Sequence, residues 1–185
     1  MQTVGSLVQE SIDFTDRGLL EAAFVSACAA FSETAKRAFE KENLSETDYK
    51  KFIEENRRLI SAMGVPSVLQ EIKSPFELQK TAPQIRTSYP LEDFLFYAVY
   101  QATVSGKLPA AFTFSNLASE SNVGKVWLPV NLIWGLLASV IFHPANKDET
   151  LPDKYWFGVG DFKMFISELW GRRDLVERIM KFYQE

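Results

Sequence analysis

The sequence predicts a mainly α fold, a single-domain helical bundle of about six or seven helices over residues 1–185. The first observation is that most long segments carry apolar residues at helical spacing between capping residues. The second is that the length of 185 residues suits one domain, and no repeat or long linker divides it. The third is two groups of short aromatic runs, at 111–128 and 154–160, which predict a small β-hairpin or a three-stranded sheet inserted in the bundle.

The N-terminal third predicts three helices. Residues 3–14 have apolar side chains at helical spacing. Residues 17–41 are rich in alanine and carry a stripe of phenylalanines, so we expect this second helix to be the central one, approached closely by several neighbours. The third helix has Ser45 as its cap with Asp48 three positions later, and it ends at Gly64.

The middle of the chain is less regular. Three prolines interrupt residues 65–89, which predicts short helical turns joined by loop. Pro90 is well placed as the first residue of a fourth helix, because proline suits the first turn, and Gly106 ends that helix.

A fifth helix is predicted from Pro129 to about Phe142. It lies in the uncharged run 126–142, whose 17 residues are close to the length that spans a bilayer. Pro129 and Asn131 interrupt this run, so we predict a buried core helix and no membrane segment.

The C-terminal segment predicts the last two helices. Asp161 is placed to cap "FKMFISELWG", and the final helix follows Gly171.

Composition limits the function classes. The formal net charge of −4 argues against a protein that coats nucleic acid, because phosphate binding usually needs a strong basic surface. The single cysteine, Cys28, excludes an intrachain disulfide and lies in an apolar segment typical of a structural thiol. The first residues lack the basic start and apolar run of a signal peptide, so we expect a cytoplasmic location.

No catalytic, metal or cofactor site is predicted. His143 is the only histidine, and it precedes Pro144, which favours a residue that ends a helix over a catalyst. Glu10, Asp13 and Asp16 fall at helical spacing and form the alternative, a carboxylate set that could hold a metal in an enzyme.

Two groups that each contain a pair of basic residues are the predicted binding residues. The first pair is Lys36 and Arg37. The second group, in "WGRRDL", is Trp170, Arg172 and Arg173. Arginine beside an aromatic ring can grip phosphate or stack on a base.

Three segments together carry a resemblance. "DRGLLEAAFVSACAAFSETAKRAF" (16–39), "LPVNLIWGLLASVIFHPANK" (128–147) and "ELWGRRDL" (168–175) resemble a family of uncharacterised bacterial helical proteins that is similar to HEPN proteins. The resemblance covers about half of the chain. It implies a small helical bundle related to RNA-cleaving and nucleotide-binding domains.

The chain departs from the catalytic HEPN pattern, in which an arginine and a histidine a few residues apart cut RNA, usually in a dimer. By resemblance, that pair would fall at Val99 or Tyr100 and at Val104 or Ser105. Neither residue type is present there, so no side chain at these positions can transfer the proton or stabilise the phosphate as in the family.

We therefore expect a non-catalytic HEPN-like protein that binds RNA, a nucleotide or a protein partner, in stress response or defence against phage. A homodimer is part of this expectation. The alternatives are the carboxylate-and-metal enzyme and an inhibitor or immunity factor whose acidic surface meets a basic target.

Overall fold

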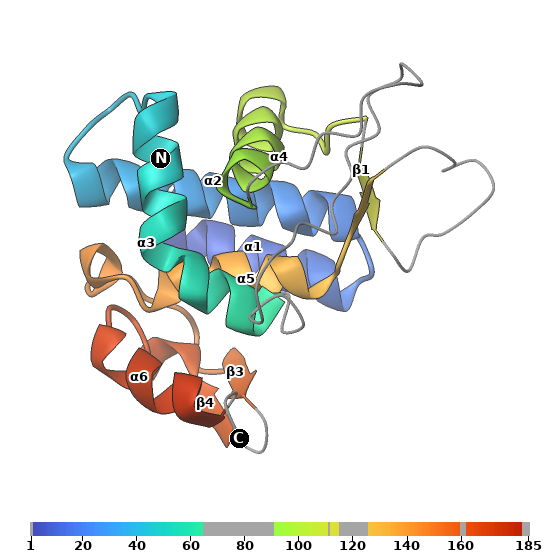
Figure 1. Cartoon of the computed structure of the whole chain (residues 1–185). Helices are drawn as coiled ribbons and strands as arrows, with labels where there is room; N and C mark the ends of the chain where they lie inside the picture. Colours follow the sequence, from blue (N-terminus) through green and yellow to red (C-terminus); the bar gives the residue numbers. More distant parts are fainter. Residues whose placement is uncertain (1, 65–90, 111, 115–125, 160–161, 183–185) are drawn as a thin grey trace.

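The computed structural model describes residues 2–64, 91–110, 112–114, 126–159 and 162–182. This part of the chain is mainly helical with two small β-sheets, which confirms the predicted fold class (Figure 1). The predicted helical turns of residues 65–89 lie outside the described residues. The α-helices are α1 (Val4–Asp16), α2 (Leu20–Phe39), α3 (Glu46–Gly64), α4 (Leu91–Ser105), α5 (Asn131–Ile141) and α6 (Arg173–Phe182).

Helix boundaries follow the capping residues. The Oγ of Ser45 accepts the Asp48 N–H at 3.2 Å, and the Asp48 carboxylate accepts the Ser45 N–H at 2.9 Å, which confirms the predicted cap of α3. The hydrogen bond from Lys41 and those from Ser45 lower the pKa of Asp48 to about 2. Gly106 and Gly171 have φ of +64° and +71°, so glycine ends α4 and precedes α6 in the left-handed region that other residues rarely adopt.

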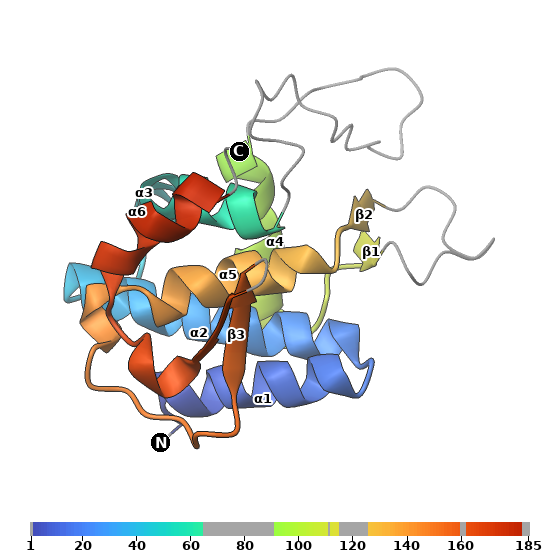
Figure 2. The ribbon, with the colours of Figure 1, turned by 90° about the horizontal axis from the view of Figure 1, so that it is seen from below.

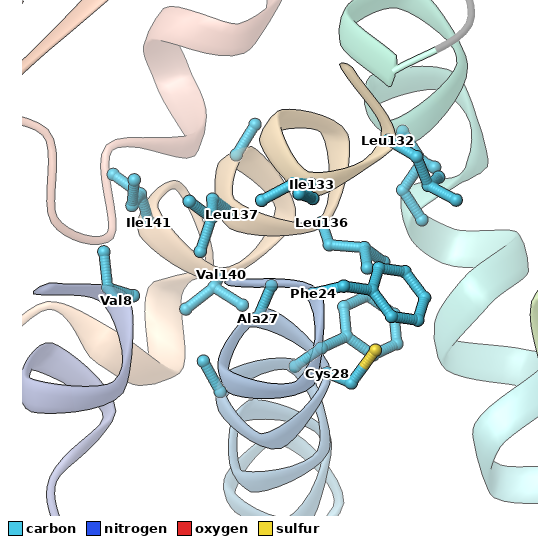
Figure 3. Packing of buried hydrophobic residues seen from close by; sticks show 14 of the residues in the cluster. Val8, Phe24, Ala27, Cys28, Leu132, Ile133, Leu136, Leu137, Val140 and Ile141 are labelled. Carbon is cyan, nitrogen blue, oxygen red and sulfur yellow. The ribbon is translucent and has the colours of Figure 1, made fainter. Parts of the chain in front are cut away.

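The central position predicted for the second helix is confirmed. α2 contacts α1, α3, α4 and α5, and Phe24 and Phe31 are fully buried. Figure 3 shows the apolar side chains of α5, among them Leu136 and Val140, next to Phe24 and Cys28 of α2. Burial raises the pKa of the Cys28 thiol, so this cysteine is a structural group in the core.

α3 and α5 approach each other at two glycines. A Cβ atom on Gly135 would lie 2.7 Å from the carbonyl oxygen of Ile60, and one on Gly64 would lie 3.2 Å from the Cα of Leu132. Glycine in a helix interior costs about 1 kcal/mol relative to alanine, and here the close backbone approach requires it. This crossing fixes the C-terminal end of α3 against the start of α5.

The strand pair of β1 (Phe112–Phe114) and β2 (Val126–Leu128) is parallel, with Phe112 opposite Val126. The hairpin predicted for residues 111–128 is therefore wrong. Parallel strands need a connection of about a dozen residues, and residues 115–125 are close to that length. The sequence indicated two strands but not the direction of the second.

β3 (Trp156–Val159) and β4 (Phe162–Phe165) form a separate antiparallel pair, followed by a short 3₁₀ helix at Ile166–Glu168. The strand predicted at 154–160 is thus present, but it does not join the sheet of β1 and β2. The helix predicted after Asp161 is wrong, because "FKMF" alternates as a strand. Its Met164 lies opposite the buried Phe157, and Phe165 is exposed.

The uncharged run at 126–142 is divided between β2 and α5, and nine residues of α5 are buried in the bundle. This confirms the predicted core helix. Within the described ranges, no helix combines the length and the apolar character needed to cross a bilayer.

Candidate functional site

His143 ends α5 and caps the next turn. Its Nδ1 accepts the Ala145 N–H at 3.2 Å, and its ring packs against Phe52 with the centroids 5.2 Å apart. Burial, together with the positive charge of Arg173, lowers the pKa of His143 to about 4. The imidazole is therefore neutral at pH 7 with Nδ1 already occupied. These contacts are those of a structural residue.

The low pKa of His143 makes stability depend on pH. The unfolded chain takes up a proton at about pH 6.5, whereas the folded chain takes it up at about pH 4, so protonation favours unfolding between these values. We expect the contribution of His143 to the free energy of unfolding to be level above about pH 6.5 and to fall as pH drops toward 4. His143→Asn keeps a capping acceptor and removes the titration. Urea unfolding at several pH values should show a shallower slope for this variant, and an unchanged slope would contradict the assignment.

The guanidinium of Arg37 makes its hydrogen bonds within the fold. Its guanidinium donates to Glu149 at 2.7 Å and to Asn146 at 3.2 Å. The other oxygen of Glu149 accepts the Gly5 N–H at 2.7 Å, at the start of α1. Arg37 thus joins the end of α2 to the start of α1. Its neighbour Lys36 pairs with a carboxylate one turn away on the same helix, at 2.6 Å.

The group Trp170, Arg172 and Arg173 does not form one surface. Trp170 is buried, and its indole N–H has no hydrogen-bond partner in the described structure. Arg173 donates to the Asn56 side chain at 2.7 Å and so ties α6 to α3. Only Arg172 is well exposed, and both its contacts are to Asp174 at 2.9 Å. A binding role for this group stays a prediction.

The three carboxylates of α1 have different surroundings. Glu10 accepts a hydrogen bond from Ser26 at 3.0 Å, and Asp13 accepts one from the Tyr155 hydroxyl at 2.8 Å. Asp16 lines a cavity. Among the described residues, no three acidic, histidine or cysteine side chains converge as metal ligands.

This cavity has a volume of about 440 Å³ and lies where α1, α3, α5 and the β3 strand meet. Figure 2 shows β3 on the side of the bundle formed by α1 and α5. We call it the aromatic cavity, because four of its lining residues have aromatic rings. It is lined by Ile12, Asp16, Met63, Asn131, Trp134, Lys154, Tyr155, Trp156, Phe157 and Gly158.

Aromatic rings and lysine ammonium groups meet at this cavity. Trp134 contacts the edge of Phe157, with ring centroids 6.0 Å apart. Lys154 places its Nζ 4.8 Å from the ring centre of Tyr155. Trp156, which is 49% exposed, has the Nζ of Lys163 4.2 Å from its ring centre. Such cation–π contacts hold positive charge beside the rings.

The outer face of the β3–β4 pair carries exposed aromatic side chains. Trp156 lies directly opposite Phe165, and both side chains are about half exposed. We call Trp156, Lys163 and Phe165 the aromatic platform. Trp156 is also a lining residue of the aromatic cavity, so the platform adjoins the cavity.

Sequence reasoning missed this surface. The segment "KYWFGVG" predicts only a strand, although its alternation places Trp156 and Phe157 on opposite faces. The remaining lining residues come from α1, α3 and α5, so no local motif contains them.

The family comparison covers almost the whole chain, with the Rv1289 family model matching residues 3–185. The chain belongs to the Rv1289 family. Similar proteins are the uncharacterised protein Rv1289 of Mycobacterium tuberculosis (strain ATCC 25618 / H37Rv) and the uncharacterised protein Mb1320 of Mycobacterium bovis. Each is 27% identical over 185 residues, which cover 96% of this chain and 88% of the relative. No solved structure matches the chain.

The Rv1289 family match spans every element around the aromatic cavity, from α1 to β4. The cavity therefore lies within the residues that the family model matches.

Proposed function

We propose that this member of the Rv1289 family is a non-catalytic, HEPN-like cytoplasmic protein that binds a nucleotide, free or within a short single strand of RNA. A role in stress response or defence against phage is part of the proposal. The observation that carries it is the exposed aromatic platform beside the aromatic cavity, with Trp156 common to both.

Exposed aromatic side chains on strands suit nucleobases. A base stacked on an aromatic ring contributes about 1–3 kcal/mol in single-strand binding, and every base has a face that can stack. Trp134 and Trp156 line the cavity, and Phe165 beside Trp156 offers a place for a second base. The cavity volume of about 440 Å³ lies in the usual range for small-molecule sites.

The lysines favour an anionic ligand. Lys154 and Lys163 place their ammonium groups at the rings of this surface, where they attract phosphate and repel a cationic ligand such as a quaternary amine. The net charge of −4 still argues against a long RNA-binding surface. A nucleotide or a few nucleotides of single strand fits both observations.

Two observations favour binding without cleavage. His143 is neutral at pH 7, and its Nδ1 accepts a backbone hydrogen bond. The positions that would carry the HEPN arginine and histidine hold Val99 or Tyr100 and Val104 or Ser105. General acid–base chemistry on RNA therefore has no candidate there.

Calorimetric titration with nucleoside monophosphates and with single-stranded RNA of about five nucleotides tests the proposal. We expect Trp156→Ala to weaken binding about tenfold or more, because one stacked base contributes about 1–3 kcal/mol. Tyr97→Ala is the matched control, since Tyr97 is 44% exposed and lies on α4, far from β3 in Figure 1.

Comparing the two ligands distinguishes a free nucleotide from a nucleotide within single-stranded RNA. Tighter binding of RNA than of monophosphates would place a second base on Phe165, and equal binding would indicate a free nucleotide. No binding of either ligand by the folded protein would refute the proposal. So would an equal loss in the Trp156 and Tyr97 variants.

A further inference from the structure

We infer that the aromatic cavity selects guanine, and that Asp16 is the residue that recognises the base. This inference rests on the proposed function and adds the identity of the base to it. The observations behind it are the position of Asp16, its lack of a partner among the described residues, and the other charged group of the cavity.

The carboxylate of Asp16 lies at the C-terminal end of α1, where the helix does not stabilise negative charge. It is the last residue of α1, and the free carbonyl groups at a helix C-terminus disfavour a carboxylate. Its side chain is exposed, and no hydrogen bond or ion pair links it to another residue of the described ranges. By contrast, Asp13, one turn earlier, accepts a hydrogen bond from Tyr155. The Asp16 carboxylate therefore keeps its full acceptor capacity.

The contact of Asp13 places Asp16 beside the rings. The Tyr155 hydroxyl donates to Asp13 at 2.8 Å and so holds the start of β3 against the last turns of α1. Asp16, Tyr155 and Trp156 consequently line the same cavity. Because Trp156 and Asp16 line the same cavity, we expect a base stacked on the face of Trp156 that Lys163 leaves open to turn its edge toward the Asp16 carboxylate.

Guanine is the base whose edge matches a carboxylate. Its N1–H and N2–H groups are adjacent donors in one plane, which can meet the two oxygens of a carboxylate in charge-assisted hydrogen bonds. Adenine and cytosine place a ring-nitrogen acceptor beside their amino group, and uracil places its one N–H between two carbonyl oxygens. Each of these three bases would set an acceptor against Asp16 and leave at least one repulsive contact.

Lys154 supplies a cation for the phosphate of the ligand. It lines the cavity, and a hydrogen bond with Tyr155 raises the pKa of its ammonium group, so it is fully charged at pH 7. A carboxylate that binds the base and an ammonium group that binds the phosphate together suit guanosine monophosphate, either free or within a strand.

Calorimetric titration of the whole protein with GMP, IMP and AMP tests the inference. The wild type should bind GMP at least about tenfold more tightly than AMP, with IMP between them because it lacks the N2 amino group. Asp16→Asn should weaken GMP binding about tenfold and leave AMP binding within about twofold. Asp153→Asn is the matched control. It removes the same charge at an exposed site next to Lys154 that does not line the cavity.

The outcomes separate this inference from the proposed function. Equal binding of GMP and AMP by the wild type would overturn the guanine selection and leave nucleotide binding intact. Equal losses for both nucleotides in the Asp16 variant would overturn it as well, since they would indicate a general effect. Thermal melting of each variant shows that it is folded, and we expect no loss of stability because Asp16 has no partner among the described residues and its charge is disfavoured at the end of α1. No binding of any nucleotide would refute the proposed function itself.

Discussion

Gly135→Val should lower the free energy of unfolding by on the order of 2–4 kcal/mol, because the crossing of α3 and α5 has no room for a side chain. A Cβ atom at this position would lie 2.7 Å from the Ile60 carbonyl oxygen and 3.1 Å from the Cα of Gly64. Both neighbours are backbone atoms, so the helices themselves must separate.

The displacement should also reach the aromatic cavity. Met63 is next to Gly64 on α3, and Trp134 is next to Gly135 on α5, and both line the cavity. We expect urea unfolding, followed by circular dichroism, to show the lower midpoint. Gln101→Val introduces the same side chain on α4 at a half-buried position that already carries a longer side chain, and it should change stability by less than about 1 kcal/mol. A Gly135 variant as stable as this control would show that the two helices can separate freely.

Phe52→Ala should destabilise the core strongly, with a loss of about 3–5 kcal/mol in the free energy of unfolding. The Phe52 ring is fully buried and lies at the centre of an aromatic cluster. Its centroid is 4.8 Å from that of Phe31, 6.0 Å from that of Phe39 and 5.2 Å from that of His143. Phe52→Leu fills most of the space and should lose clearly less, which chemical denaturation would measure.

The same substitution should change His143. Burial is the first cause of its low pKa, and removing Phe52 lets water reach the ring. In a folded Phe52→Ala protein, the pKa of His143 should rise from about 4 toward the ordinary 6.5, as an NMR titration of the single imidazole would show. An unchanged pKa would mean that Arg173, and not burial, keeps the imidazole neutral.

Local chemistry was enough to predict the α-helices of the described residues, although it also predicted a helix after Asp161 where the structure has a strand. Ser45 and Asp48 bond each other's backbone N–H groups at the start of α3. Gly106 and Gly171 adopt positive φ beside helix ends. Each effect depends on residues a few positions apart, so it can be recognised in a short segment. The alanine-rich composition of α2 likewise indicated its central position, since small side chains allow several helices to approach it.

The strands required more than local chemistry. The run at 112–114 and the run at 126–128 have strand composition, but whether they pair in parallel depends on how the chain returns between them. The segment "FKMF" follows Asp161, a residue type that caps helices, and pairing with β3 makes it a strand instead.

The sequence by itself determined a helical bundle, the caps at Ser45, Gly106 and Gly171, and the buried stripes of its helices, because these depend on residues a few positions apart. Only the tertiary structure decided which charged residues are available. In the folded protein, Arg37 and Arg173 donate hydrogen bonds to residues of other segments, whereas Asp16 and Lys154 line a cavity. The cavity is built from α1, α3, α5 and β3, and long-range packing, which no local pattern encodes, brings these four segments together.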